Sequence, residues 1–200
     1  MISIAEIRKA EILDHFYKVI SSHGFSGTTL EKIAKSMGVK PSLLLHYYKS
    51  KEEIISGFVD FIIRKYEDVY ISSIRDIEDP EKRLLLLLDL LFAKELSELV
   101  NDKAFYECYS LSITHPEVKE KFRSFYERFR EKLIKEISIL RNKGVVTSDP
   151  MDHAADFLIV LLEGKDLYSN LIKDEHCFES LLVYLKAQAY KTLTGREIKR

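Results

Sequence analysis

The sequence predicts an all-α protein of about nine helices, and three observations support this fold class. Only 7 Gly and 4 Pro occur in 200 residues, too few for the frequent turns of a β-sandwich or β-barrel. Hydrophobic residues make up 46% of the chain, with 11 Phe and 11 Tyr, which excludes a disordered chain. Apolar residues also recur three and four positions apart, and no stretch alternates as a half-buried strand does.

Three helices are predicted near the N-terminus. The first covers about residues 5–23 and ends at Gly24, because glycine readily adopts the left-handed conformation that follows a helix. Its apolar stripe consists of Ile7, Ala10, Leu13, Tyr17 and Ile20. A capping box from Thr28 to Glu31 opens the second helix, whose buried side consists of Leu30, Ile33, Ala34 and Met37. Pro41 then opens a short third helix over about 41–48.

Longer helices follow. A second capping box, from Ser50 to Glu53, opens a helix that continues to about residue 70. A leucine-rich helix starts at Asp79-Pro80, and another covers about 117–142 before Gly144. The last two predicted helices cover about 151–172 and 176–193. The densest apolar run, residues 84–93, is shorter than the ~18 residues that a membrane span requires, and no signal peptide is evident.

Charge is unevenly distributed along the chain, although the net charge is only -1. Residues 1–51 contain eight Lys or Arg and four Asp or Glu, a net charge of +4, so the remaining residues carry -5. This asymmetry is expected if only the N-terminal part meets a polyanion such as DNA. Cys108 and Cys177 fit neither a disulfide framework nor a zinc site, so we expect reduced thiols and no bound metal.

The second and third predicted helices form a helix-turn-helix motif over about 29–48. The surrounding segment resembles the N-terminal signature of TetR-family transcriptional repressors, through Gly24-Phe25, Thr28-Thr29, Ile33-Ala34, Gly38-Val39 and His46-Tyr47-Tyr48-Lys49-Ser50-Lys51-Glu52-Glu53. The resemblance implies a DNA-binding domain over 6–66 and an effector-binding and dimerisation domain over 67–200. It also implies a homodimeric repressor that a small apolar or aromatic effector releases from a palindromic operator.

The third helix has one side that faces the core, with Leu44 and Tyr48, and one side available to a major groove. The residues predicted to contact DNA are Thr28, Thr29, Lys40, Pro41, Ser42, Leu43, Leu45, His46, Tyr47 and Lys51. Leu43 and Leu45 either meet thymine methyl groups or pack sideways against the first or fourth helix. Thr28 either contacts a phosphate or serves only as a cap, and Lys40 either contacts DNA or is solvated. For Lys51, in the first turn of a helix, a phosphate neighbour is favoured because the macrodipole disfavours a cation there.

The C-terminal part carries two further apolar sets. By the resemblance, the small-molecule pocket is lined by Phe61, Tyr66, Phe92, Tyr106, Tyr109, Phe125, Phe129 and Tyr168, although most aromatic residues must belong to the core. Glu107, Glu163 or Asp166 is either a partner for a cationic ligand or a solvated acid. The last two helices either close the core or pair with a second copy, and the residues expected in a dimer interface are Leu158, Leu161, Leu162, Leu181, Leu182 and Leu185.

The leading interpretation is a cytoplasmic, ligand-responsive DNA-binding repressor without a cofactor. Its expected partners are double-stranded DNA, a small-molecule effector and a second copy, and no membrane. The alternative is a helical adaptor or DNA-coating protein of the same fold without an inducer. An enzyme is least favoured, because neighbours such as Asp152-His153 and His176-Cys177 point about 100° apart on a helix. No HExxH motif, phosphate-binding loop or nucleophile elbow occurs either.

Overall fold

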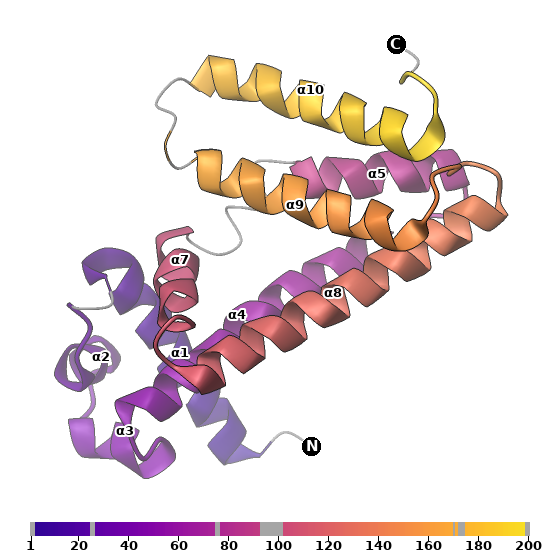
Figure 1. Ribbon diagram of the computed structural model, residues 1–200. Coiled ribbons are helices and arrows are strands. Elements are labelled where there is room, and N and C mark those ends of the chain that lie inside the picture. The colour runs from indigo at the N-terminus through magenta and orange to yellow at the C-terminus, as the bar shows by residue number, and fades with distance from the viewer. Residues whose placement is uncertain are drawn as a thin grey trace. The chain divides into compact units, whose positions relative to one another are not determined.

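The computed structural model describes residues 3–24, 27–74, 77–92, 102–169, 171 and 175–198, without the side chains of 51–52, 65–74, 102–104, 151–152 and 175–177. Within these ranges the chain forms nine helices and no strand (Figure 1). The all-α prediction is therefore confirmed. The chain divides into two compact units: unit 1 contains Met1–Glu67 and Val100–Phe125, and unit 2 contains Asp68–Leu99 and Tyr126–Arg200.

Unit 1 begins with α1 (Ile4–His23), which a capping box of Ser3 and Glu6 opens and Gly24 closes at φ 71°. The predicted apolar stripe is only partly right, because Ile7 is 48% exposed and Ala10 is exposed as well. Residues 3–8 are all exposed, so the helix starts outside the core and apolar residues there remain uncovered. The buried side of α1 consists of Ile12, Leu13, Phe16, Val19 and Ile20.

Helix α2 (Leu30–Met37) has a different N-cap from the one predicted. The Thr29 hydroxyl accepts from the backbone N–H of Lys32 at 3.3 Å, while the Thr28 hydroxyl donates to the Gly24 carbonyl at 2.7 Å. Thr28 is fully buried, so its hydroxyl joins the end of α1 to the start of α2. The predicted Thr28 capping box was therefore displaced by one residue, although Ile33 and Ala34 are buried as expected.

Helix α3 (Pro41–Tyr47) ends at Tyr48, whose ring packs against α4 (Lys51–Ile74). A Cβ atom at Gly57 would lie 3.2 Å from Tyr48 Cε1 and 3.3 Å from the Tyr48 hydroxyl oxygen. Because real Cβ contacts are rarely this short, glycine at 57 gives the ring the space that it occupies. The Ser50 hydroxyl accepts from the N–H of Glu53 at 3.2 Å, as the second capping box predicts.

Helix α7 (Asp102–Leu111) follows in unit 1 and was not predicted from the sequence. Its Glu107 carboxylate reaches the end of α1, since a Cβ atom at Gly24 would lie 2.8 Å from Glu107 Oε1. Helix α8 (Pro116–Asn142) starts at the predicted proline and ends before Gly144, at φ 74°. In its unit 1 part, Lys121 forms an ion pair with Asp60 of α4.

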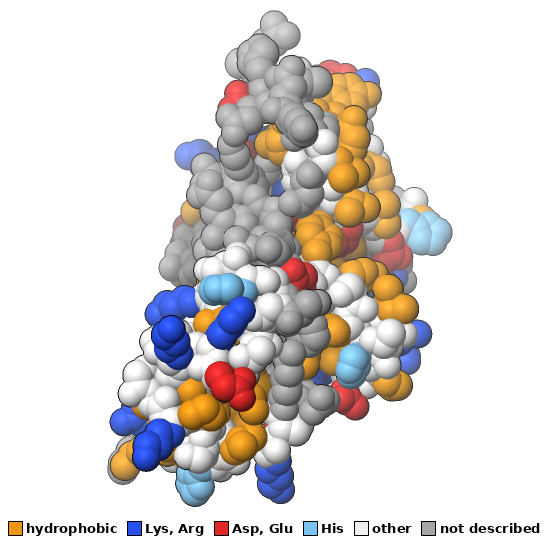
Figure 2. Space-filling view, turned by 90° about the vertical axis from the view of Figure 1, so that its left-hand side faces the viewer, with side chains coloured by type: hydrophobic (Ala, Val, Ile, Leu, Met, Phe, Trp, Pro, Cys, Tyr) orange, Lys and Arg blue, Asp and Glu red, His pale blue; other side chains and the backbone are white. Residues whose placement is uncertain are grey.

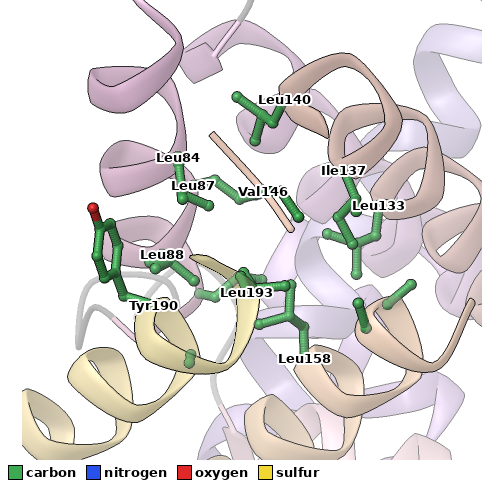
Figure 3. Packing of buried hydrophobic residues seen from close by; sticks show 14 of the residues in the cluster. Leu84, Leu87, Leu88, Leu133, Ile137, Leu140, Val146, Leu158, Tyr190 and Leu193 are labelled. Atoms are coloured by element: carbon green, nitrogen blue, oxygen red, sulfur yellow. The ribbon is translucent and has the colours of Figure 1, made fainter. Parts of the chain in front are cut away.

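Unit 2 contains α5 (Pro80–Phe92), α9 (Met151–Ser169) and α10 (Glu175–Thr194), which pack on one another (Figure 1). The Asp79 carboxylate caps α5 by accepting from the N–H groups of Glu81 and Lys82. Arg83 of α5 forms a bidentate ion pair with Glu136 of α8, with Nε–Oε2 and Nη2–Oε1 distances of 2.8 and 2.9 Å. These elements enclose a mainly aliphatic, apolar core. Figure 3 labels Leu84, Leu87, Leu88, Leu133, Ile137, Leu140, Val146, Leu158, Tyr190 and Leu193 in it.

Three side chains assigned to binding surfaces lie in this core instead. Leu158 and Leu162, predicted for a dimer interface, are buried, and so is Phe92, predicted for a ligand pocket. The reason for the first two is the rotation of α9, which turns Ala154, Leu158 and Leu162 toward α5. Among the described residues, no helix combines the length and apolar character that crossing a bilayer would require.

Candidate DNA interface

Helix α3 has an inner face that fixes its position within unit 1. Leu44 is fully buried and Tyr48 is 4% exposed, which confirms the prediction that both belong to the core. The Tyr48 hydroxyl donates to the carbonyl of Lys9 in α1 at 3.4 Å. Burial, with a smaller contribution from the nearby Glu53 carboxylate, raises the pKa of Tyr48 to about 12, so the phenol stays protonated and can donate this hydrogen bond.

The outer face of α3 carries most of the predicted DNA contacts. Pro41, Ser42, Leu45 and His46 are exposed, and Lys40 precedes them at the N-cap position, also exposed. Leu45 is 46% exposed, so the structure leaves it uncovered rather than packed against a neighbouring helix. An uncovered leucine on a helix-turn-helix is suited to a thymine methyl group in the major groove.

Two predicted residues beside this face are more enclosed. Leu43 and Tyr47 are half-buried, and the Tyr47 ring lies edge-on to His46, with 5.0 Å between the ring centroids. This contact orients both side chains at the C-terminal end of α3. A phenol or imidazole fixed in this way can donate to a phosphate without losing much side-chain freedom.

Exposed charges around α2 and α3 are mainly positive. Lys32, Lys35 and Lys49 are exposed together with Lys40, against the exposed carboxylate of Glu31. Figure 2 faces the side of the molecule that carries α2 and α3, where blue cationic side chains lie at several places around apolar ones and a red acidic side chain lies beside them. A basic rim around an apolar reading surface suits a duplex with charged strands and less polar base edges.

The two threonines before α2 have different roles. Thr29 is exposed and caps α2, so its hydroxyl lies where a phosphate could be contacted. Thr28 is enclosed and its hydroxyl already donates to Gly24, so we withdraw Thr28 from the predicted contacts. The side chain of Lys51 lies outside the described residues, and only its backbone position at the start of α4 is known.

The residues predicted for a ligand pocket are distributed over both units. In unit 1, Phe125 is buried, Phe61 and Tyr106 are half-buried, and Tyr109 is exposed; in unit 2, Phe129 is half-buried beside the core and Tyr168 is exposed. The Tyr66 side chain lies outside the described residues. The structure therefore gives these eight residues unequal environments rather than one shared lining.

The acidic residues considered as partners for a cationic ligand also lie in different environments. In unit 2, burial raises the pKa of Glu163, while a hydrogen bond from Tyr126 lowers it in part. Burial likewise raises the pKa of Asp166, against the opposing effect of Lys165, whose ammonium lies 2.6 Å from it. Lys165 itself is 4% exposed and donates to the Leu91 carbonyl at 3.3 Å, so it caps the C-terminal end of α5.

Several exposed apolar residues on α9, directly after it and on α10 were not among the six residues predicted for the dimer interface. They are Val160, Leu167, Leu171, Val183 and Tyr184. A signal was present, because Val160, Gly164 and Leu167 follow the four-three spacing of one helix face, whereas Leu171 lies beyond the end of α9 at Ser169. Of the predicted interface residues, Leu161, Leu181, Leu182 and Leu185 are half-buried.

Of the neighbouring groups considered for enzyme chemistry, the side chains of Asp152 and His176 lie outside the described residues. Asp156 accepts from Arg130, with Nε–Oδ1 at 2.5 Å, and this hydrogen bond holds the pKa of Asp156 below its usual value. Within the described residues, no three His, Cys, Asp or Glu side chains are placed to hold a metal ion. Cys108 is buried, which raises its pKa to about 12, and the Cys177 side chain lies outside the described residues.

Comparison with known proteins gives two family matches. Residues 12–57 match the model for bacterial regulatory proteins of the tetR family, and residues 79–194 match the tetracyclin repressor-like C-terminal domain. Together these matches cover the helix-turn-helix and most of unit 2.

Individual proteins agree with the family matches. The chain is 21% identical over 163 residues to the HTH-type transcriptional regulator BetI of Rhizobium meliloti, covering 82% of this chain and 78% of that protein. It is 36% identical over 70 residues to the biofilm operon negative transcriptional regulator IcaR of Staphylococcus epidermidis, covering 31% of this chain and 38% of that one.

A solved structure of similar fold is a putative transcriptional regulator from Saccharomonospora viridis in complex with choline. It has a TM-score of 0.83 and 18% identity, over 95% of this chain and 99% of that one. At this identity the likeness concerns the fold alone. The helix-turn-helix geometry, the outer face of α3 and the match over residues 79–194 together show that this chain belongs to the TetR family of DNA-binding transcriptional regulators, which are not enzymes.

Proposed function

We propose that the chain is a repressor that binds a palindromic DNA operator through α3. The observation that carries this proposal is the division of α3 into an anchored inner face and an uncovered outer face, with Leu45 46% exposed. The name of IcaR describes a negative regulator, which supports repression over activation. Exposed lysines around α2 and α3 supply the attraction to phosphates.

The test is a selection from random DNA, followed by binding measurements over a range of salt concentrations. An enriched palindrome is expected, because a two-fold protein presents the same reading helix to both half-sites. Lys40→Ala or Lys51→Ala should weaken binding to all DNA. Each should also reduce the salt slope, that is, the steepness with which log K falls with log salt concentration, by ~1. Leu45→Ala should instead change the preferred base at one position of each half-site, with the salt slope preserved.

A matched control is Lys191→Ala, which removes one exposed positive charge from α10 in unit 2. It should leave both the preferred sequence and the salt slope unchanged. If the selection returned no enriched sequence while DNA was still bound, the alternative of a DNA-coating protein would replace the operator-binding repressor. If no salt-sensitive DNA binding occurred at all, both interpretations would be wrong.

We also propose that the chain forms a homodimer through the exposed side of α9 and α10. The support is the seam of Val160, Gly164 and Leu167 on α9, to which Leu171 after the helix and Val183 and Tyr184 of α10 add further exposed apolar area. Gly164 has open space around it, so another helix can approach closely at that position. The half-buried leucines originally expected in the interface would then lie at its edge.

Light scattering after size-exclusion chromatography tests the dimer. Leu167→Asp should yield monomers, because it places a charge in the proposed seam. Ile113→Asp is the control, since Ile113 is 82% exposed in unit 1 and lies outside the seam. A dimeric Leu167→Asp protein, or a monomeric wild-type protein, would refute this interface.

For the effector, we propose a small apolar or aromatic molecule, and the charge at Glu163 favours a cationic molecule as a second candidate. The choline complex of the similar S. viridis protein makes choline a reasonable probe. If the effector is cationic, choline should raise the unfolding temperature of the wild-type protein and not that of Glu163→Gln. Stabilisation of both proteins by neutral aromatic compounds would favour the first candidate.

A further inference from the structure

Lys9 lies outside the helix-turn-helix, in the second turn of α1, and contacts the residue that ends α3. Its ammonium is 5.2 Å from the centre of the Tyr48 ring, within the range of a cation–π interaction. Its backbone carbonyl accepts the Tyr48 hydroxyl at 3.4 Å. Both ends of Lys9 therefore contact one tyrosine, which Gly57 of α4 allows to pack closely.

This contact places Lys9 at the junction of α3 and α4. Tyr48 is followed directly by Lys49, which is exposed, and α4 begins at Lys51. The turn between them is held by the N–H of Lys49, which donates to the Glu53 carboxylate at 2.6 Å. Lys9, about 40 residues earlier in the sequence, is thus brought to the corner of unit 1 where Lys49 and the backbone of Lys51 lie.

Lys9 differs from two other cationic residues of α1, which form ion pairs with carboxylates on the same helix. Arg8 is paired with Glu11 at 2.6 Å and Lys18 with Asp14 at 2.7 Å. Lys9 forms no ion pair with any carboxylate that the structure describes. Its ammonium lies over the face of an aromatic ring instead, a contact that leaves its N–H donors available to an anion.

We propose that Lys9 is a phosphate contact of the DNA-binding unit, positioned by Tyr48 at the α3–α4 junction. This inference rests on the proposed DNA-binding function and extends the interface to a helix outside the helix-turn-helix. The ring limits the freedom of the Lys9 side chain before DNA arrives. Less conformational entropy is then lost when the phosphate binds, as with any preorganised contact.

The expected effect is electrostatic and independent of sequence. The loss of one phosphate contact makes the fall of log K with log salt concentration less steep by ~0.9. This change corresponds to about fivefold weaker binding at ~0.15 M salt. Because a phosphate carries no base information, the weakening should be equal on the selected operator and on unrelated DNA.

The experiment compares the wild-type protein with Lys9→Ala, Lys9→Arg and Lys18→Ala by fluorescence anisotropy on both DNAs, after circular dichroism has verified folding. Lys18→Ala is the matched control, because it removes the same charge from the same helix at an ion-paired, exposed position. The inference requires a reduced slope for Lys9→Ala and nearly wild-type slopes for Lys9→Arg and Lys18→Ala.

Two results would overturn the inference while the proposed function stands. One is a wild-type slope for Lys9→Ala, and the other is an equal reduction in Lys9→Ala and Lys18→Ala, which would indicate a general charge effect. A wild-type protein without salt-dependent DNA binding would instead refute the proposed function itself, so the two failures are distinguishable.

Discussion

Replacing Glu136 with alanine should destabilise unit 2 through the arginine that remains. Glu136 accepts two hydrogen bonds from Arg83, at 2.8 and 2.9 Å, and the two side chains are 17% and 13% exposed. Without the carboxylate, the Arg83 guanidinium keeps only the Ile77 carbonyl, at 3.4 Å. A mostly buried cation would then lack both its counter-charge and its best hydrogen bonds.

The magnitude follows from the burial of the pair. Breaking a fully buried ion pair costs about 3–5 kcal/mol, and the residual exposure reduces our expectation to about 2–3 kcal/mol. For a chain of this length that corresponds to a Tm lower by about 4–12 °C. Urea unfolding followed by circular dichroism measures the loss of unfolding free energy, at one fixed protein concentration because the stability of the proposed dimer would depend on concentration.

Two comparisons make the reasoning refutable. The pair of Arg141 and Asp149 has an Nη1–Oδ1 distance of 3.1 Å but is 38% and 71% exposed, so Asp149→Ala should cost about 1 kcal/mol or less. The double variant Arg83→Met/Glu136→Leu should be much more stable than Glu136→Ala, since no charge is left behind. A Glu136→Ala protein as stable as Asp149→Ala, or a double variant as unstable as Glu136→Ala, would show that the unpaired cation is not the cause.

Three further predictions concern unit 1. Thr29→Ala should lower the free energy of unfolding by about 1 kcal/mol through loss of the α2 cap, whereas Thr29→Ser should retain most of it; an equal loss in both would count against the cap. Leu44→Ala should cost about 2–5 kcal/mol, because it empties a fully buried site, and unfolding curves close to wild type would contradict the packing. Cys108 has a folded pKa of about 12 against 9.0 for a free thiol, so its stabilising effect is complete below pH 9 and is lost as pH rises above it, by about 1 kcal/mol at pH 10. Cys108→Ala should lack this part of the pH dependence, and identical curves for the two proteins would refute it.

Local signals in the sequence predicted most of the fold because they act over a few residues. Prolines place the starts of α3, α5 and α8 almost to the residue, since Pro41, Pro80 and Pro116 each occupy the first helical position, and Gly24 and Gly38 directly follow α1 and α2. The cap of α2 was displaced by one position because Thr28 and Thr29 are chemically equivalent candidates. They are separated by the turn after α1, which directs the Thr28 hydroxyl to the Gly24 carbonyl four residues earlier.

The candidate site was predictable to the extent that it depends on helix periodicity. The outer face of α3 follows from its spacing once Leu44 and Tyr48 are assigned to the core. The rotation of α9 does not, because apolar residues surround that helix and its sequence alone cannot distinguish the side with Leu158 from the side with Val160. Lys9 was missed because its partner Tyr48 is 39 residues away, and no local pattern connects them.

The glycine at position 57 has a practical consequence for the exchange of DNA-binding domains between regulators of this family. Tyr48 occupies the space that a Cβ atom at Gly57 would fill, so the α3–α4 junction and the second turn of α4 must be kept together. A chimera joined between these positions would combine a tyrosine with a helix that has no room for it, unless the second parent also carries glycine there. The suitable crossover point therefore lies after Gly57, well inside α4 rather than at the turn before it.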